Sequence, residues 1–200
     1  MTTSQRQRIY IAEPDIDRRE KRRVMSVLES GDLADGEEVR SFEDEFADYC
    51  GVSHGVATAN GTAALHAALA ALDIGEGDRV LTTPFSFVAT ANAIRLAGAE
   101  PVFADIDPAT YNIDPDAAEE VIREHDGDVD AILVVHLYGL PVQLDRFRDL
   151  AETYDAALVE DCAQAHGAEY CGKRVGSFGD AAAFSFYPTK NMTTGEGGMV

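Results

Sequence analysis

The sequence predicts an α/β sandwich in which helices cover a mostly parallel central sheet. Two patterns in the 200-residue chain lead to this fold class. Short apolar runs alternate with longer amphipathic segments along the chain, which is typical of strands connected through helices. Apolar residues make up 46% of the sequence, which is enough to fill a substantial core. We find no internal repeat and no obvious linker that would divide the chain.

Six segments have the apolar spacing of amphipathic helices. The first ends at Gly31, a residue that commonly terminates helices. The second places Val39, Phe42, Phe46 and Tyr49 on one face, and the third is rich in alanine and leucine. The predicted helices comprise residues 15–30, 37–49, 62–72, 87–97, 115–124 and 144–154.

Strands are predicted where short apolar runs lie between these helices. The first run ends at the turn Asn60-Gly61. The predicted strands are 52–59, 79–82, 101–104, 131–135, 156–160 and 181–186, and residues 198–200 begin another. Sheets of this kind bind ligands beyond the carboxyl ends of their strands. The candidate site segments are therefore 60–62, 84–87, 136–139, 161–166 and 185–190.

The charge of the chain is strongly acidic. Its 36 acidic and 16 basic residues give a formal net charge of −20. Such a surface repels nucleic acid and anionic lipid, so we expect neither nucleic acid nor a membrane as a partner. The acidic residues are scattered among apolar ones, which indicates a folded protein with an acidic surface. This suggests a halophilic protein or, alternatively, an ordinary acidic one, and melting temperature measured against salt distinguishes the two.

Cysteine usage and the N-terminus indicate a cytoplasmic protein. The three cysteines have no CxxC spacing, which argues against a disulfide framework or a zinc site. The five histidines show no metal-ligand spacing either, so no metal site is predicted. The first eight residues lead to no apolar signal region, and no apolar run approaches the ~18 residues of a membrane span.

The turn Asn60-Gly61-Thr62 lies between a predicted strand and a predicted helix. Glycine permits close approach of a ligand, and the N–H groups at a helix start attract a phosphate. The hydroxyl group of Thr62 could add a hydrogen bond. The alternative is an ordinary N-capped turn.

Three further side chains at strand ends are candidate ligands of a planar cofactor. Asp161 follows an apolar strand, where a carboxylate requires a cation such as a protonated pyridine nitrogen. Gln164 could bond a ring substituent, and Phe87 could stack on a ring. The alternatives are a capping or loop aspartate, a glutamine bonded to loop backbone, and a core phenylalanine.

Lys190 is one of only three lysines, against thirteen arginines. It lies in a loop after an apolar strand. A lysine amine can lose its proton and form a Schiff base, whereas arginine stays protonated. The alternative is a surface lysine.

These residues belong to blocks that together resemble a known family. The chain is similar, from about residue 11 to its end, to the sugar aminotransferases of the DegT/DnrJ/StrS family, within the fold type I enzymes that depend on pyridoxal 5′-phosphate (PLP). The matching blocks are GTAALH (61–66), PFSFVAT (84–90), DID (105–107), VHLYG (135–139), EDCAQAHG (160–167), FSFYPTKN (184–191) and TGEGG (194–198).

The resemblance implies a role for each matching position. Lys190 would bind PLP covalently as a Schiff base and then act as the acid–base in proton transfer. Asp161 would pair with the pyridine nitrogen and keep it protonated. Gln164 would contact the 3-hydroxyl of the ring, and Phe87 would stack on its face. The phosphate would be held by Thr62, Ala63 and Ser185.

The resemblance also implies a fold and an activity. The fold is the three-layer sandwich of fold type I, with a mostly parallel mixed sheet. The activity is transfer of an amino group, from glutamate, to a keto group of a nucleotide-activated sugar, for polysaccharide, glycan or amino-sugar biosynthesis. Because members of the family continue further, residues 1–200 are expected to form the N-terminal and large PLP-binding portion of a homodimeric enzyme, truncated at its C-terminus and without the small C-terminal domain.

Two alternatives use the same scaffold. One is a PLP-dependent sugar dehydratase, in which histidine replaces the lysine, so Lys190 argues against it. The other is a non-catalytic or regulatory remnant of the fold.

Overall fold

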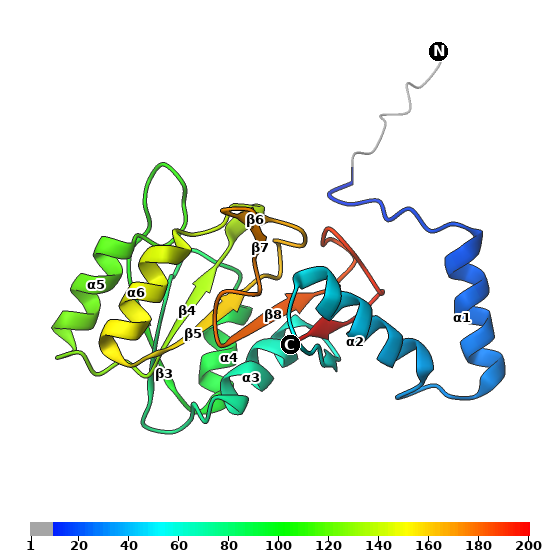
Figure 1. Cartoon of the computed structure of the whole chain (residues 1–200), viewed down its shortest axis with the longest axis horizontal. Helices are drawn as coiled ribbons and strands as arrows, with labels where there is room; N and C mark the ends of the chain where they lie inside the picture. Colours follow the sequence, from blue (N-terminus) through cyan, green and yellow to red (C-terminus); the bar gives the residue numbers. More distant parts are fainter. Residues whose placement is uncertain (1–9) are drawn as a thin grey trace, which may run out of the picture.

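The computed structural model describes residues 10–200, whose helices flank a seven-stranded sheet (Figure 1). The strand order is β1-β9-β8-β5-β4-β2-β3. The helices are α1 (Arg18–Ser30), α2 (Glu37–Cys50), α3 (Gly61–Ala71), α4 (Ala89–Ala97), α5 (Pro115–Glu124) and α6 (Leu144–Tyr154). The strands of the sheet are β1 (Ala57–Thr58), β2 (Arg79–Thr82), β3 (Glu100–Phe103), β4 (Ala131–Val135), β5 (Ala157–Asp161), β8 (Ala181–Ser185) and β9 (Gly198–Met199).

The sheet is mixed but mostly parallel. Strands β3, β2, β4, β5 and β8 pair in parallel, and β9 pairs antiparallel with both β8 and β1. In register, Val135 lies opposite Asp161, so the carboxyl ends of β4 and β5 meet at one edge. The predicted α/β class with a mostly parallel mixed sheet is therefore confirmed.

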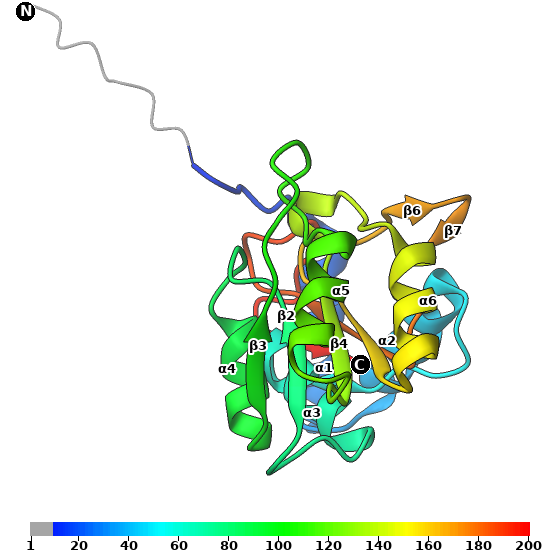
Figure 2. The ribbon, with the colours of Figure 1, turned by 90° about the vertical axis from the view of Figure 1, so that its left-hand side faces the viewer.

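The buried side chains form two separate hydrophobic cores, one on each face of the sheet. In β4, Ile132 and Val134 pack into one cluster with α2, α5 and α6, whereas Leu133 and Val135 pack into the other with α3 and α4. Successive side chains of a strand point to opposite faces, which explains the division. Figure 2 shows α4 and α6 on opposite sides of the sheet. Each fully buried leucine or isoleucine in these layers stabilises the fold by about 1.5–3 kcal/mol.

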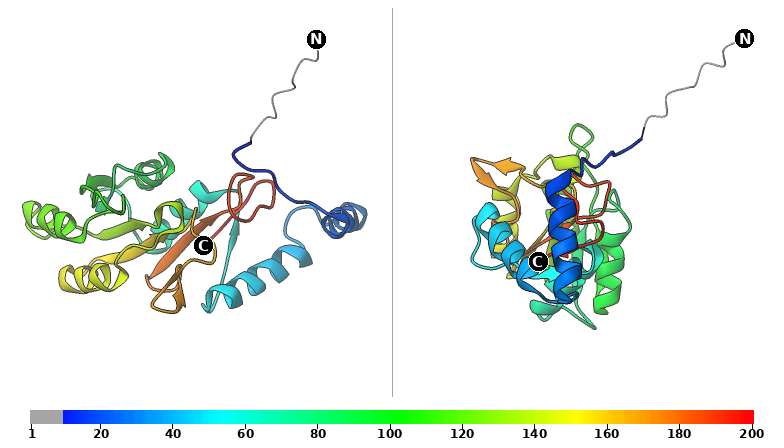
Figure 3. Two further views of the ribbon diagram at one scale, coloured as in Figure 1. Left: turned by 90° about the horizontal axis from the view of Figure 1, so that it is seen from above. Right: turned by 90° about the vertical axis from the view of Figure 1, so that its right-hand side faces the viewer.

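Helix α1 lies apart from these layers, as Figures 1 and 3 show. Asp17 and Glu20 form a capping box at its start, which explains why it begins at Arg18 instead of residue 15. Gly31 ends it in the left-handed conformation, as predicted. The helix has no buried residue. No helix within residues 10–200 is long and apolar enough to cross a lipid bilayer.

The structure differs from the sequence prediction at several edges. The predicted strand 52–59 is reduced to β1, because only its end pairs with the short strand β9. Helix α4 begins at Ala89, so Phe87 lies in the preceding loop. The hairpin of β6 (Glu169–Tyr170) and β7 (Lys173–Arg174) and the 3-10 helix η1 (Leu137–Gly139) are not predicted.

Candidate functional site

A cavity of about 350 Å³ lies where the ends of β4, β5 and β8 meet the N-terminus of α3. Its volume is within the range of small-molecule sites. It brings together six of the seven residues predicted to form the site: Thr62, Phe87, Asp161, Gln164, Ser185 and Lys190. The other lining residues are Asn60, Gly61, Leu65, Ser86, Ala89, Val135, Ala163, Tyr187, Thr189 and Glu196.

Asp161 is a buried carboxylate at the end of β5, only 5% exposed. Its Oδ1 accepts a hydrogen bond from the Ala163 amide at 3.1 Å, and its Oδ2 accepts one from the Thr90 hydroxyl group at 2.8 Å. Burial raises the pKa of Asp161, although these hydrogen bonds and the charge of Lys190 act in the opposite direction. The anion therefore lacks sufficient compensation, which suits a cationic ligand in the cavity.

Lys190 lies on the same cavity, in the loop that follows β8. Its backbone N–H donates to the Tyr187 carbonyl at 2.9 Å, which holds the loop in a turn. Burial lowers the pKa of the half-buried Lys190 amine, and the negative charge of Asp161 partly opposes this. A lowered pKa increases the fraction of neutral amine, the nucleophilic form.

The N-terminus of α3 approaches the end of β8 because residue 61 is glycine. A Cβ atom on Gly61 would lie 2.7 Å from the Ser185 Cβ. The N–H groups of Gly61 and Thr62, in the first turn, have no acceptor within the helix. The side-chain hydroxyl groups of Thr62 and Ser185 border the same space. This combination can hold an anion such as a phosphate.

Ala63 differs from the other predicted phosphate ligands. It is not among the residues that line the cavity. Its amide donates to the Asn60 side chain at 2.9 Å, which makes Asn60 the N-cap of α3. The capped turn, proposed as an alternative to a phosphate site, is thus present together with the open cavity, and the phosphate role of Ala63 stays a prediction.

Gln164 and Phe87 occupy the rim of the site. The Gln164 side-chain oxygen accepts the Tyr138 amide at 2.9 Å, so its NH₂ group remains available as a donor. Phe87 is 67% exposed, so it is not a core phenylalanine. An exposed ring at a cavity rim can cover a planar ligand.

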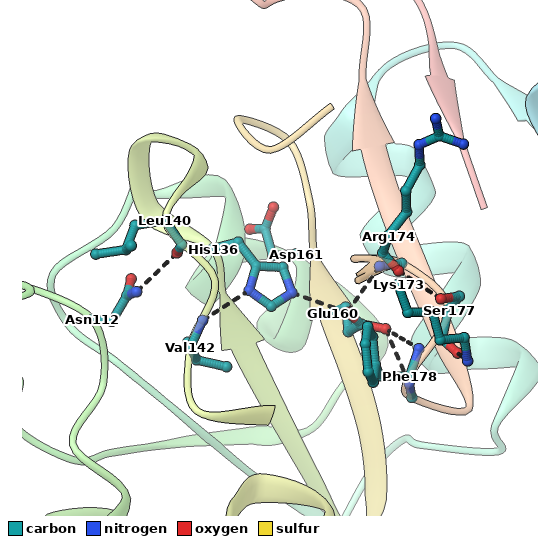
Figure 4. A network of polar contacts seen from close by, with 12 residues as sticks. Asn112, His136, Leu140, Val142, Glu160, Asp161, Lys173, Arg174, Ser177 and Phe178 are labelled. Atoms are coloured by element: carbon teal, nitrogen blue, oxygen red, sulfur yellow. Dashed lines mark hydrogen bonds and ion pairs between the residues drawn. The ribbon is translucent and has the colours of Figure 1, made fainter. Parts of the chain in front are cut away.

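Glu160 and His136, the chain neighbours of the cavity-lining Asp161 and Val135, form a buried polar pair (Figure 4). His136 Nδ1 accepts the Val142 amide at 3.2 Å, so Nε2 carries the hydrogen and donates to Glu160 at 3.0 Å. Burial opposes ionisation of Glu160, but His136 and the amides of Gly176 and Gly179 outweigh it and lower its pKa. As neighbours on one strand, Glu160 and Asp161 point in different directions.

The Glu160 carboxylate accepts from the amides of Gly176, Phe178 and Gly179 at 2.8, 2.8 and 3.0 Å and thereby closes a loop beside β5. Possible metal-ligand atoms of His136, Glu160 and Cys162 lie within 4.8 Å of one another. Because the histidine and glutamate already bond each other, we interpret the group as part of the fold.

Replacing Glu160 with glutamine is expected to destabilise the protein by about 3 kcal/mol, because the amide turns its NH₂ group toward buried N–H donors. The pKa of Glu160 lies below its ordinary 4.5 in the folded state, so its stabilising effect is complete above that value and is lost as pH falls through the folded pKa. Glu160→Gln should remove this acid-side dependence. Urea unfolding at several pH values measures both effects. Glu169→Gln, at an exposed position, is the matched control, and equal stability of the two variants would contradict the expectation.

Three residues at the site lie in the matching blocks 84–90 and 194–198 but received no individual role from the sequence. Ser86 and Glu196 line the cavity, and Thr90 contacts Asp161 across 71 positions of sequence. Apart from its place in the block PFSFVAT (84–90), the sequence signal for Thr90 was a hydroxyl residue within a predicted helix. It gave no indication of its partner.

A family model for the DegT/DnrJ/EryC1/StrS aminotransferase family matches residues 14–200. The chain belongs to this family. It is 42% identical over 194 residues to a GDP-perosamine synthase of Caulobacter vibrioides, an alignment that covers 96% of this chain and 52% of that protein. The predicted family is thereby confirmed.

Solved structures agree with this assignment. The aminotransferase from Psychrobacter cryohalolentis is 44% identical, with a TM-score of 0.88 over 93% of this chain and 47% of that one. The PLP form of a Streptococcus pneumoniae protein described as a sugar aminotransferase is 30% identical, with a TM-score of 0.90 over 96% of this chain and 52% of that one. The chain thus spans about half the length of these relatives.

Proposed function

We propose that this chain is the cofactor-binding large-domain portion of an aminotransferase that uses PLP to transfer an amino group, from glutamate, to a keto group of a nucleotide-activated sugar. One observation carries the proposal: the buried Asp161 carboxylate and the half-buried Lys190 amine line one cavity beside the N-terminus of α3.

The residues that line the cavity fit PLP. Asp161 offers an undercompensated anion for a protonated pyridine nitrogen. Lys190 offers an amine with a lowered pKa for the aldehyde. For the phosphate, Thr62, Ser185 and the free N–H groups of α3 form a cradle without a basic side chain, which suits a chain of charge −20. When bound, PLP supplies an electron sink for the bond that is broken at the substrate carbon.

The protein's own groups then have separate tasks. Lys190 holds the cofactor and afterwards moves a proton at its Nζ atom. Asp161 would keep the ring nitrogen of bound PLP protonated. Phe87 covers one ring face and Gln164 donates its NH₂ group to the 3-hydroxyl oxygen, in keeping with their positions at the rim.

The substrate class follows from the relatives. One is a GDP-perosamine synthase, and another, 45% identical, is an aminotransferase named for a UDP-N-acetyl-3-dehydroglucosamine substrate. A nucleotide-activated keto sugar is therefore the acceptor that we propose for this protein. We also propose that it acts as a cytoplasmic homodimer when the remaining half of its relatives' length is present.

The experiment is a half-reaction followed by turnover. PLP is added to the protein, glutamate is added, and absorbance reports conversion of PLP to the pyridoxamine form. A 4-keto nucleotide sugar should then restore the original spectrum. A folded protein that binds no PLP would contradict the proposal and favour a non-catalytic or regulatory remnant. PLP binding with sugar dehydration and no amino transfer would favour a dehydratase.

A further inference from the structure

We propose that Thr90 is a positioning residue for the cofactor, because its hydroxyl group holds the Asp161 carboxylate in a fixed orientation toward the cavity while Ser86 holds Thr90 in turn. The inference rests on the proposed function, since it assigns Thr90 a role toward PLP.

Thr90 lies in the first turn of α4 and is 1% exposed, so water cannot replace its contacts. Its Oγ1 is 2.8 Å from Asp161 Oδ2 and 2.8 Å from the Ser86 Oγ. Ser86 lines the cavity, whereas Thr90 does not. Two hydroxyl groups in series therefore connect the cavity wall with the buried carboxylate.

The direction of these hydrogen bonds follows from the chemistry of a hydroxyl group. Thr90 has a single hydroxyl hydrogen, and an ionised Asp161 can only accept. Thr90 therefore donates to Asp161, and Ser86 must donate to Thr90. Donation from Ser86 polarises the Thr90 hydroxyl group and strengthens its bond to the carboxylate.

The two oxygens of Asp161 are held from different elements. Oδ1 is held by the Ala163 amide in the loop after β5, and Oδ2 is held by Thr90 on α4. Because each carboxylate oxygen accepts one hydrogen bond, the carboxylate cannot rotate freely. The lone pairs that accept no hydrogen bond from the protein therefore keep a fixed orientation. Without Thr90, Oδ2 would lose the only protein donor that it has within the described residues.

The same turn of α4 also places Phe87. The Thr90 amide donates to the Phe87 carbonyl at 3.1 Å. The start of α4 thus positions both Phe87, a candidate ring-stacking residue, and Thr90, which orients Asp161. Lys190 and His136 are the ionisable side chains near Asp161, and the substitutions below leave both unchanged.

The test compares Thr90→Val, which keeps the shape but removes the hydroxyl group, with Thr90→Ser, which keeps the hydroxyl group. PLP affinity is measured by titration of each apo-protein, and the bound cofactor's absorbance is followed against pH. We expect Thr90→Val to weaken PLP binding roughly 10- to 100-fold, the usual contribution of a hydrogen bond to a charged group, and to shift the pH profile. The PLP affinity of Thr90→Ser should stay within about threefold of the wild-type affinity. The affinity of Ser86→Ala should lie between those of Thr90→Val and Thr90→Ser.

A double-mutant cycle separates positioning from simple packing. In an Asp161→Asn background, Thr90→Val should cost little further affinity, because the carboxylate that it serves is gone. An equal cost in both backgrounds, or wild-type affinity and an unchanged pH profile for Thr90→Val, would overturn the inference. If Thr90→Val does not fold, Ser86→Ala replaces it in the same cycle, and it should weaken PLP binding in the wild-type background but cost little further affinity in the Asp161→Asn background. Failure of the wild type to bind PLP would instead count against the proposed function itself.

Discussion

Replacing Lys190 with alanine is expected to abolish covalent attachment of PLP. The wild type, treated with PLP and then borohydride, should carry the cofactor on the peptide that contains Lys190. Loss of both the covalent anchor and the proton-transfer group should lower the amino-transfer rate by at least about 10²–10⁴-fold, the usual contribution of general acid–base catalysis alone. Lys190→Arg should fail equally, since arginine stays protonated although its charge and length are similar.

The composition of the chain makes this experiment unusually clear. It has only three lysines, Lys21, Lys173 and Lys190, so peptide mapping by mass spectrometry leaves little ambiguity. Lys173 is the matched control, because its amine is exposed and donates to the Ser177 carbonyl away from the cavity. Lys173→Ala should label at Lys190 to the wild-type extent. Labelling of Lys190→Ala at another lysine to the same extent would contradict the assignment.

The sequence was sufficient for the residues that stand at strand ends. Lys190 and Asp161 follow buried apolar runs, and parallel strands bring their carboxyl ends together. Thr90 was not predictable in this way. Its contact with Asp161 joins a helix to a strand 71 positions away, and no local pattern encodes the rotation that aims one hydroxyl group at one carboxylate oxygen.

Similar reasons explain the other differences. The sequence indicated no hydrogen-bonding role for Glu160, the last residue of a predicted strand. The amides that donate to its carboxylate lie in a loop without periodicity, so no sequence pattern connects them with Glu160. The β6–β7 hairpin has strands of two residues, too short for an alternating pattern. Strand β1 is shorter than its apolar run because its length depends on its partner β9, which contributes two residues.

Replacing Asp161 with asparagine is expected to lower the amino-transfer rate and to raise the stability of the protein without PLP. The neutral amide cannot keep the pyridine nitrogen protonated, so amino transfer should fall by about 10²–10³-fold, as for removal of one preorganised electrostatic partner of a reacting group. PLP affinity should fall as well. The fold should tolerate the change, because the asparagine oxygen can still accept the Ala163 amide while its NH₂ group donates to Thr90, which then turns its own hydrogen toward Ser86.

The stability effect has a defined dependence on pH. The pKa of Asp161 is raised above its ordinary 3.8 in the fold, chiefly by burial, so the folded state holds a proton more tightly than the unfolded state. Stability of the wild-type apo-protein should therefore fall as pH rises from about 3.8 through the folded pKa. Asp161→Asn removes this fall. The apo variant should therefore be more stable than the apo wild type at neutral pH, and this difference in stability should disappear in acid.

Saturating PLP should make the wild type the more stable of the two proteins at neutral pH, because the cofactor's cation compensates a carboxylate that only the wild type has. Thermal unfolding with and without PLP at pH 5 and pH 8 measures all four conditions. An apo variant less stable than the wild type at pH 8 would show that the buried carboxylate is already compensated by the protein, and that its burial is not maintained for a cationic ligand.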